Sequence, residues 1–141
     1  MLPDAIQLEI VTPEKRLVME TVDEVVLPGS EGFLGVLPGH APLLTGLGIG
    51  ELVYRRGNVR HYLAITSGFA EVLPARVSVL AEVGERAEEI DLDRAQKARD
   101  RALGRMRGRD SETDFKRAQV ALEKAVVRIQ VAGKGGHAGP S

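Results

Sequence analysis

The chain has 141 residues, of which 43% are hydrophobic and 28% charged, a composition that indicates one small globular domain, with or without an appendage, and excludes a disordered protein. Its formal net charge of −1 excludes the strong positive field by which many proteins attract nucleic acid or anionic lipid. The absence of cysteine excludes disulfides, thiolate nucleophiles and cysteine-based zinc sites, and agrees with a reducing cytoplasm.

Residues 1–84 are rich in helix breakers, since they hold six of the seven prolines and ten of the sixteen glycines. Apolar side chains recur there at every second position, which predicts half-buried strands. Three such runs are Ile6, Leu8 and Ile10; His61, Leu63 and Ile65; and Val77, Val79, Ala81 and Val83. No helix-length segment separates these runs, so we expect an antiparallel β-sandwich or barrel. We expect neither a secretory signal nor a membrane span, which needs roughly 20 apolar residues in a row.

Residues 85–132 contain no proline and show two apolar stripes with the spacing of amphipathic helices. The stripes are Leu92, Ala95, Ala98 or Arg99, Ala102 and Met106, then Phe115, Ala118, Leu122, Ala125, Val126 and Ile129. Asp91 and Gly108 suit the start and the end of the first helix, and Ser111 with Asp114 resembles a capping box for the second. The short link predicts an antiparallel hairpin. Because the first stripe is mostly alanine, the hairpin is either weakly held and movable or a fixed appendage.

No motif indicates catalysis or metal binding. His40, His61 and His137 lack the spacing of metal ligands, and no nucleophile elbow is present. The glycine-rich run at 46–51 is followed by a strand-like segment instead of a helix, and the run at 133–136 lacks the remainder of a phosphate loop. We therefore expect no catalytic residue, no metal and no required cofactor.

Basic side chains form a row on each helix, at the same offsets of zero, seven and eleven residues. The rows are Arg94, Arg101 and Arg105, then Arg117, Lys124 and Arg128. They fit either a polyphosphate-binding surface or a solvated face, because residues 85–132 hold twelve basic and ten acidic side chains. A nucleic-acid groove would need aromatic side chains beside the charge, and the helices offer only Phe115. We expect no nucleic acid as a partner.

The stretch GSEGFLGVLPGHAPLLTGL, residues 29–47, resembles the signature of the epsilon subunit of rotary F-type ATP synthases. Further resemblance lies in LEIVTPE near the start, TSGFAEVLPARVSVLAE at 66–82, IDLDRA at 90–95 and FKRAQVALEKAVVRI at 115–129. The resemblance implies an N-terminal β-sandwich in residues 1–86 and a regulatory helical hairpin in residues 87–132. We expect residues 133–141 to be a flexible tail. The resemblance also implies a non-catalytic subunit that couples ring rotation to the catalytic head.

In that family, the sandwich binds the gamma subunit and the polar loops of the c-ring, and the extended hairpin contacts the catalytic alpha and beta subunits and inhibits ATP hydrolysis. The resemblance assigns the ring contact to Ser30, Glu31, Gly32 and Phe33, and the stalk contact to His40, Ala41, Pro42, Leu43 and Leu44. Phe33 departs from the family, in which a polar or acidic residue is common at this position. The implied location is peripheral, without membrane insertion, on the cytoplasmic face of the bacterial inner membrane.

Some bacterial members bind ATP on the folded hairpin through an I/L-D-x-x-R-A motif and further basic residues. The corresponding residues here are Glu85, Ile90, Asp91, Arg94, Ala95, Arg101, Lys124 and Arg128. Lys124 replaces an arginine of the tight binders, which keeps the charge but removes the bidentate fork. The resemblance thus implies regulatory ATP. Alternatives are a free-standing ATP-sensing module that shares the fold, and an enzyme whose residues show no recognisable constellation.

Overall fold

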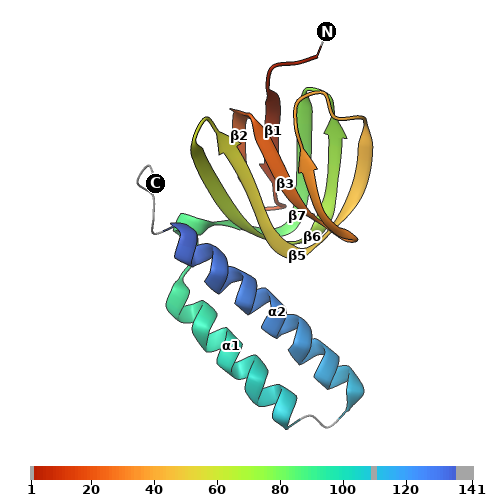
Figure 1. The fold of residues 1–141 in the computed structure, drawn as a ribbon. Coiled ribbons are helices and arrows are strands. Elements are labelled where there is room, and N and C mark those ends of the chain that lie inside the picture. Colours follow the sequence, from red (N-terminus) through yellow and green to blue (C-terminus); the bar gives the residue numbers. More distant parts are fainter. Residues whose placement is uncertain (1, 109–110, 136–141) are drawn as a thin grey trace.

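The computed structural model describes residues 2–108 and 111–135, which form a seven-stranded β-domain followed by two helices (Figure 1). The strands are β1 Ile6–Val11, β2 Arg16–Val22, β3 Glu24–Gly29, β4 Gly32–Val36, β5 Leu43–Arg56, β6 Val59–Leu73 and β7 Arg76–Arg86. A short 3-10 helix, η1 Ala87–Glu89, leads to α1 Leu92–Arg107 and α2 Glu112–Gly135. The predicted β-sandwich with an antiparallel helical hairpin is confirmed.

The strands form one sheet in the order β2-β1-β7-β6-β5-β3-β4. All neighbouring pairs are antiparallel except β1 and β7, which run parallel. The expectation of a purely antiparallel sandwich is wrong at this pair. Parallel neighbours need a long connection, and strands β2 to β6 together supply it, so that the first and last strands of the domain lie side by side.

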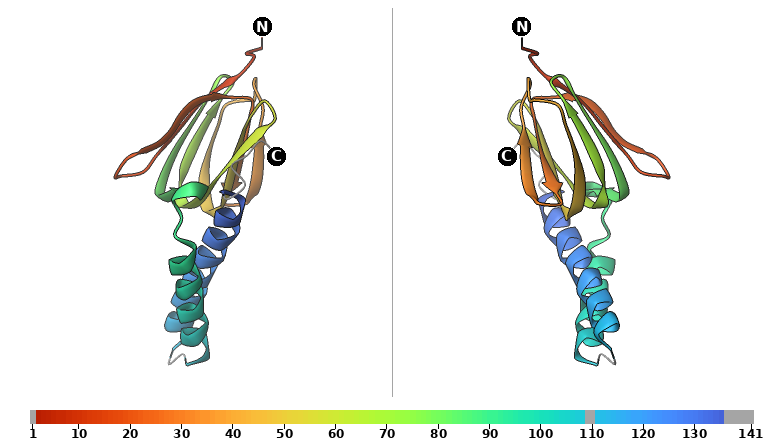
Figure 2. Two further views of the ribbon diagram at one scale, coloured as in Figure 1. Left: turned by 90° about the vertical axis from the view of Figure 1, so that its left-hand side faces the viewer. Right: turned by 90° about the vertical axis from the view of Figure 1, so that its right-hand side faces the viewer.

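The sheet folds over on itself, as the two side views show (Figure 2). Strands β2 and β5 are far apart in the sheet order, yet the Tyr54 hydroxyl donates a hydrogen bond of 2.6 Å to Glu20 and Arg56 lies 2.6 Å from the same carboxylate. Partial burial would raise the pKa of Glu20, but the hydrogen bonds from Tyr54 and Arg56 outweigh it and hold the pKa below its usual value. Burial and the adjoining Glu20 carboxylate raise the pKa of Tyr54. This contact closes the sandwich.

Alternation in the strands directs the predicted side chains to the core with two exceptions. The runs at 6–10 and 77–81 and the pair Leu63 and Ile65 are buried as expected. His61 is only half-buried and stacks on the Tyr54 ring, with 4.8 Å between ring centroids. Val83 is 52% exposed although it continues the alternation of Val77, Val79 and Ala81. Alternation alone therefore did not predict that this valine lies outside the core.

Both helices begin at the predicted residues. Asp91 Oδ1 accepts a hydrogen bond of 3.1 Å from the Arg94 amide, and Ser111 Oγ accepts one of 3.1 Å from the Asp114 amide. Helix α1 ends at Gly108, also as predicted. Helix α2, however, continues to Gly135, so residues 133–135 belong to the helix and not to a flexible tail. Residues 136–141, with His137, lie outside the described residues.

The hairpin attaches to one end of the sandwich and projects away from it (Figures 1 and 2). Helices α1 and α2 contact each other, and the buried residues along them are mostly alanines, namely Ala95 and Ala102 on α1 and Ala118 and Ala125 on α2. A cluster separate from the sandwich core joins the hairpin to the sheet, and its buried members are Ala64, Ala87, Ile90 and Val131. The hairpin therefore has its own small apolar contact with the sandwich.

Candidate functional site

A groove of about 260 Å³ lies between the outer face of the sheet and the hairpin. Its walls are apolar, with Ile49, Ala64 and Val83 among the sheet residues and Ala98, Ala121 and Val127 among the helical residues. Glu85, Lys124 and Arg128 supply its charged groups. An apolar groove with a few converging charged groups can bind a small molecule that is flat and apolar at one end and anionic at the other.

The charged groups of the groove are partly engaged with each other. Arg128 holds Glu85 through both nitrogens of its fork, with Nε to Oε1 at 2.6 Å and Nη2 to Oε2 at 3.2 Å. Both side chains are about three-quarters buried, with 26% and 27% of their surface exposed. Lys124 is exposed, and its ammonium group forms no ion pair with any of the described residues. An anion in the groove would therefore meet Lys124 without competition, whereas Arg128 already has a carboxylate partner.

The remaining residues of the expected nucleotide site do not line this groove. Asp91 caps α1, Ala95 is fully buried on α1, and Ile90 belongs to the small cluster with Val131. Arg94 and Arg101 are exposed on α1. The structure thus brings together three of the eight expected residues and gives three others structural roles.

The expected ring contact is an exposed turn between β3 and β4. Ser30, Glu31 and Gly32 are exposed, and Gly32 has a φ of 129°, which favours glycine over any residue with a side chain. Phe33 follows on β4 with 71% of its surface exposed. It lines an open depression of about 410 Å³ together with Tyr62 and Lys134, so the turn lies near the end of α2.

The expected stalk contact leads into strand β5. The His40 ring nitrogen Nδ1 lies 2.7 Å from the Ala41 carbonyl, which fixes the ring against the backbone. Ala41 and Pro42 are exposed, and Leu43 and Leu44 begin β5 with 39% and 72% of their surface exposed. The segment therefore presents apolar side chains to solvent.

Two further exposed apolar residues extend this surface and were not predicted. Phe69 pairs with Leu80 across β6 and β7, and these side chains are 61% and 59% exposed. Leu44 lies on the neighbouring strand and on the same side of the sheet, because its partner Glu71 and Phe69 are two positions apart on β6. We call Leu44, Phe69 and Leu80 the outer apolar face. The sequence signal was available, since Phe69 and Leu80 alternate with the buried Ala70 and Val79.

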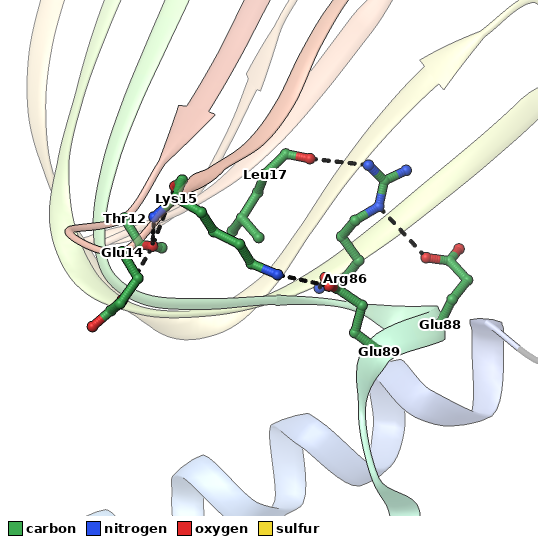
Figure 3. A network of polar contacts seen from close by, with 7 residues as sticks. All are labelled: Thr12, Glu14, Lys15, Leu17, Arg86, Glu88 and Glu89. Atoms are coloured by element: carbon green, nitrogen blue, oxygen red, sulfur yellow. Dashed lines mark hydrogen bonds and ion pairs between the residues drawn. The ribbon is translucent and has the colours of Figure 1, made fainter.

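A network of polar contacts fixes the point where the chain leaves the sandwich (Figure 3). Arg86 donates a hydrogen bond of 2.9 Å to the Leu17 carbonyl of β2, and Lys15 lies 2.8 Å from Glu89 of η1. The hydrogen bond from Lys15 holds the pKa of Glu89 below its usual value despite some opposing burial. We call Lys15, Leu17, Arg86 and Glu89 the clamp. It ties η1 to the turn between the first two strands.

Neither helix of the described residues is long and apolar enough to cross a membrane. Within residues 2–108 and 111–135, no cluster of three or more histidines and acids could hold a metal ion. No polar side-chain atom that is buried in this part of the chain lacks a hydrogen-bond partner.

The chain matches two family descriptions that together cover most of its length. Residues 5–87 match "ATP synthase, Delta/Epsilon chain, beta-sandwich domain", and residues 88–133 match "ATP synthase, Delta/Epsilon chain, long alpha-helix domain". A protein of Solibacter usitatus named ATP synthase epsilon chain is 54% identical over 101 residues, which are 72% of this chain and 75% of that relative. ATP synthase epsilon chain 1 of Syntrophotalea carbinolica is 48% identical over 132 residues, 93% of this chain and 96% of its own.

Solved structures with the same fold come from ATP synthases. One is a chain of the Euglena gracilis mitochondrial ATP synthase, solved as OSCP/F1/c-ring, with a sequence identity of 25% and a TM-score of 0.80. The match covers 97% of this chain and 84% of the Euglena chain. Another is a chain of the Tetrahymena thermophila mitochondrial ATP synthase, solved as central stalk/c-ring, with a sequence identity of 16% and a TM-score of 0.65. The match covers 90% of this chain and 96% of the Tetrahymena chain, and at this identity it shows only that the fold is shared.

Proposed function

The chain belongs to the ATP synthase delta/epsilon chain family, and on that premise we propose that it is a non-catalytic central-stalk subunit of a bacterial, proton-translocating F-type ATP synthase. In this role it transmits rotation of the membrane c-ring to the catalytic head through the gamma subunit. Residues 1–86 bind stalk and ring, and residues 87–132 regulate hydrolysis. The subunit is peripheral and works on the cytoplasmic face of the inner membrane.

The outer apolar face is the observation that carries the stalk contact. Leu44, Phe69 and Leu80 lie side by side on adjoining strands, and each has more than half of its surface exposed. A contiguous patch of exposed large apolar side chains on a soluble domain usually marks a protein interface. The face continues the segment His40–Leu44, to which the resemblance assigns the gamma contact. We therefore assign the outer apolar face to the same interface.

The β3–β4 turn supports the ring contact. It is a short, exposed turn in which Gly32 permits a close approach of backbone to backbone. Glu31 offers a charge to the polar loops of the c-ring, and the exposed Phe33 adds an apolar contact where other members are polar.

The hairpin is proposed to inhibit ATP hydrolysis when it extends toward the alpha and beta subunits. Its support is charge, because Arg94, Arg101 and Arg105 are exposed on one helix and Arg117 and Lys124 on the other. Such rows bind an acidic protein surface or a polyphosphate.

Regulatory ATP is proposed to bind the folded hairpin at the groove. Lys124 and Arg128 supply positive charge beside apolar walls, and Glu85 lies with them. For Arg94 and Arg101 to take part, the hairpin must shift from the described arrangement, since neither lines the groove. Titration calorimetry on the full chain tests this, because Arg94→Ala and Arg101→Ala should each weaken ATP binding, about tenfold if a fork is lost. Unchanged affinity in both variants would remove these residues from the site.

Binding of the gamma subunit tests the central proposal. Replacing Phe69 and Leu80 by serine should weaken the complex by about tenfold or more, because buried apolar anchors dominate interface energies. Val59→Ser is the matched control, since Val59 is also an exposed apolar strand residue but lies outside the outer apolar face. Equal affinity of the double variant and the wild type would contradict the proposed stalk contact.

Reconstitution tests regulation. An assembly whose subunit stops after Glu89 keeps β7 and the clamp, so it should remain coupled while hydrolysing ATP faster than the assembly with the full chain. Equal hydrolysis rates would exclude the inhibitory role. A free-standing ATP sensor, the alternative, would bind ATP but not the gamma subunit.

A further inference from the structure

Two carboxylates border the outer apolar face at opposite ends. On β6, Glu71 is two positions from Phe69 and directly opposite Leu44 of β5. On β7, Glu82 is two positions from Leu80, in the other direction along the sheet. A strand rises about 3.3 Å per residue, so each acid lies about 7 Å along its strand from a member of the face. We call Glu71 and Glu82 the flanking acids.

The flanking acids have no charged partner within residues 2–108 and 111–135. Both are exposed, and Glu71 points away from the core because its two neighbours on the strand are buried. Glu9, on the same side of the sheet in β1, differs from them, since its carboxylate lies 3.1 Å from Arg16 Nε. The two unpaired charges are therefore available to a binding partner.

The charge around the outer apolar face is negative. Arg76, at the start of β7, is four positions from Leu80 and thus farther from it than either flanking acid. Residues 1–86 as a whole contain eleven acidic and seven basic residues. This charge repels an anionic lipid surface, and it repels the same face of a second copy, because a two-fold interface brings identical patches together. A partner with basic side chains around an apolar centre is attracted.

We propose that the flanking acids select which partner the outer apolar face binds. They admit a protein surface whose apolar centre is bordered by lysine or arginine side chains, and they exclude a second copy of this chain. This inference rests on the proposed function only for the identity of the partner, which in that role is the gamma subunit. The apolar side chains supply most of the binding energy, whereas the acids speed association with a basic surface and penalise an acidic one.

Association kinetics with the gamma subunit test the attraction. The double variant Glu71→Gln with Glu82→Gln should associate about three- to tenfold more slowly at low salt, because it loses electrostatic steering, and its rate should depend less on salt than that of the wild type. Its dissociation rate should change little. Glu14→Gln with Glu123→Gln is the matched control, since it removes the same charge at exposed positions outside the face. Equal association rates and equal salt dependence in the two double variants would overturn the proposal.

Sedimentation of the full chain without any partner tests the exclusion. The wild type should remain at its monomer mass of 15.2 kDa. The self-association constant of the Glu71→Gln, Glu82→Gln variant should be about tenfold or more above that of the wild type, because the repulsion between copies is removed. Adding Phe69→Ser and Leu80→Ser to this variant should restore the monomer. Equal self-association of the wild type and the glutamine variant would overturn the exclusion, as would a dimer that persists with both serines.

The two measurements separate this inference from the proposed function. If Phe69→Ser with Leu80→Ser weakens gamma binding while the glutamine variant behaves as its control, the stalk contact stands and selection by the flanking acids is overturned. If the gamma subunit does not bind the wild type, the proposed function fails, and sedimentation still decides whether the flanking acids exclude a second copy.

Discussion

The sandwich and the hairpin bury side chains of different sizes. The sandwich core contains fully buried tyrosine, isoleucine and leucine side chains, for example Tyr54, Ile65 and Leu52. The hairpin buries mostly alanine, and it meets the sheet through a cluster with only four buried members. Because apolar burial stabilises in proportion to area, the sandwich is the more stable unit and the hairpin the part that detaches first. One chain can thus combine a permanent platform with a movable element.

The largest expected effect is in the sandwich core. Leu52→Ala should lower the free energy of unfolding by about 2 to 5 kcal/mol, since it leaves a cavity at a fully buried position. Leu92→Ala is the control, because Leu92 on α1 is 43% exposed and should cost under about 1 kcal/mol. Urea denaturation followed by circular dichroism measures both. Similar costs would abolish the contrast between the two regions.

The next effect concerns the contact that closes the sandwich. Glu20→Gln should lower stability at neutral pH by about 1 to 3 kcal/mol, because it replaces a charged hydrogen-bond acceptor beside Tyr54 and Arg56. The lowered pKa of Glu20 contributes stability that is complete above the ordinary glutamate pKa, about 4.3, and is lost as the pH falls through the native value. Between pH 6 and pH 3, roughly, the wild type should lose more stability than the variant. Parallel pH profiles would show that Glu20 is not responsible.

A smaller effect is expected where the hairpin meets the sheet. Val131→Ala removes two buried methyl groups and should cost about 1 to 1.5 kcal/mol. The loss should be seen as faster hydrogen exchange in α2 with little change in the sandwich. Val120→Ala is the control on the same helix, since Val120 is exposed. A uniform effect over the whole chain would mean that hairpin and sandwich unfold as one unit.

The smallest effect is expected at the clamp. Lys15 and Glu89 form a surface ion pair with 56% and 40% of their side chains exposed, so Lys15→Ala should cost only about 0.2 to 1 kcal/mol. The cost should shrink in high salt, which screens exposed pairs. Thermal unfolding of the wild type and the variant, each in low and high salt, measures this. A larger, salt-independent loss would indicate that the aliphatic part of Lys15 contributes by packing.

Local signals explain which parts of the fold could be predicted. The caps at Asp91, Gly108 and Ser111 and the alternation in β1, β6 and β7 are properties of short segments, and the structure confirms them. The parallel pairing of β1 with β7 depends on a contact between strands far apart in the sequence, which alternation does not encode. The exposure of Val83 likewise departs from the alternation. The extension of α2 to Gly135 likewise depends on Glu51, Tyr62 and Ala87.

The candidate sites likewise divide into those that local sequence signals predicted and those that depend on tertiary contacts. The exposed turn at 30–33 and the segment at 40–44 were identified from a sequence signature, whereas Phe69 and Leu80 required knowledge of which outward-facing side chains remain uncovered. Helical spacing placed Arg94 and Arg101 on one face of α1. It could not determine whether that face lies on the groove, because this depends on how the hairpin docks.

The parallel pairing of β1 with β7 also constrains how the chain folds during synthesis. The hairpin of β1 and β2 can form early, but the other edge of β1 stays unpaired until β7, more than sixty residues later, has left the ribosome. Pairing over such a separation is slow, and an open strand edge is prone to join another chain. A ribosome that stalls before Arg76 would therefore release a fragment with a tendency to aggregate, whereas one that stalls beyond Glu89 would release a sandwich with every strand in place.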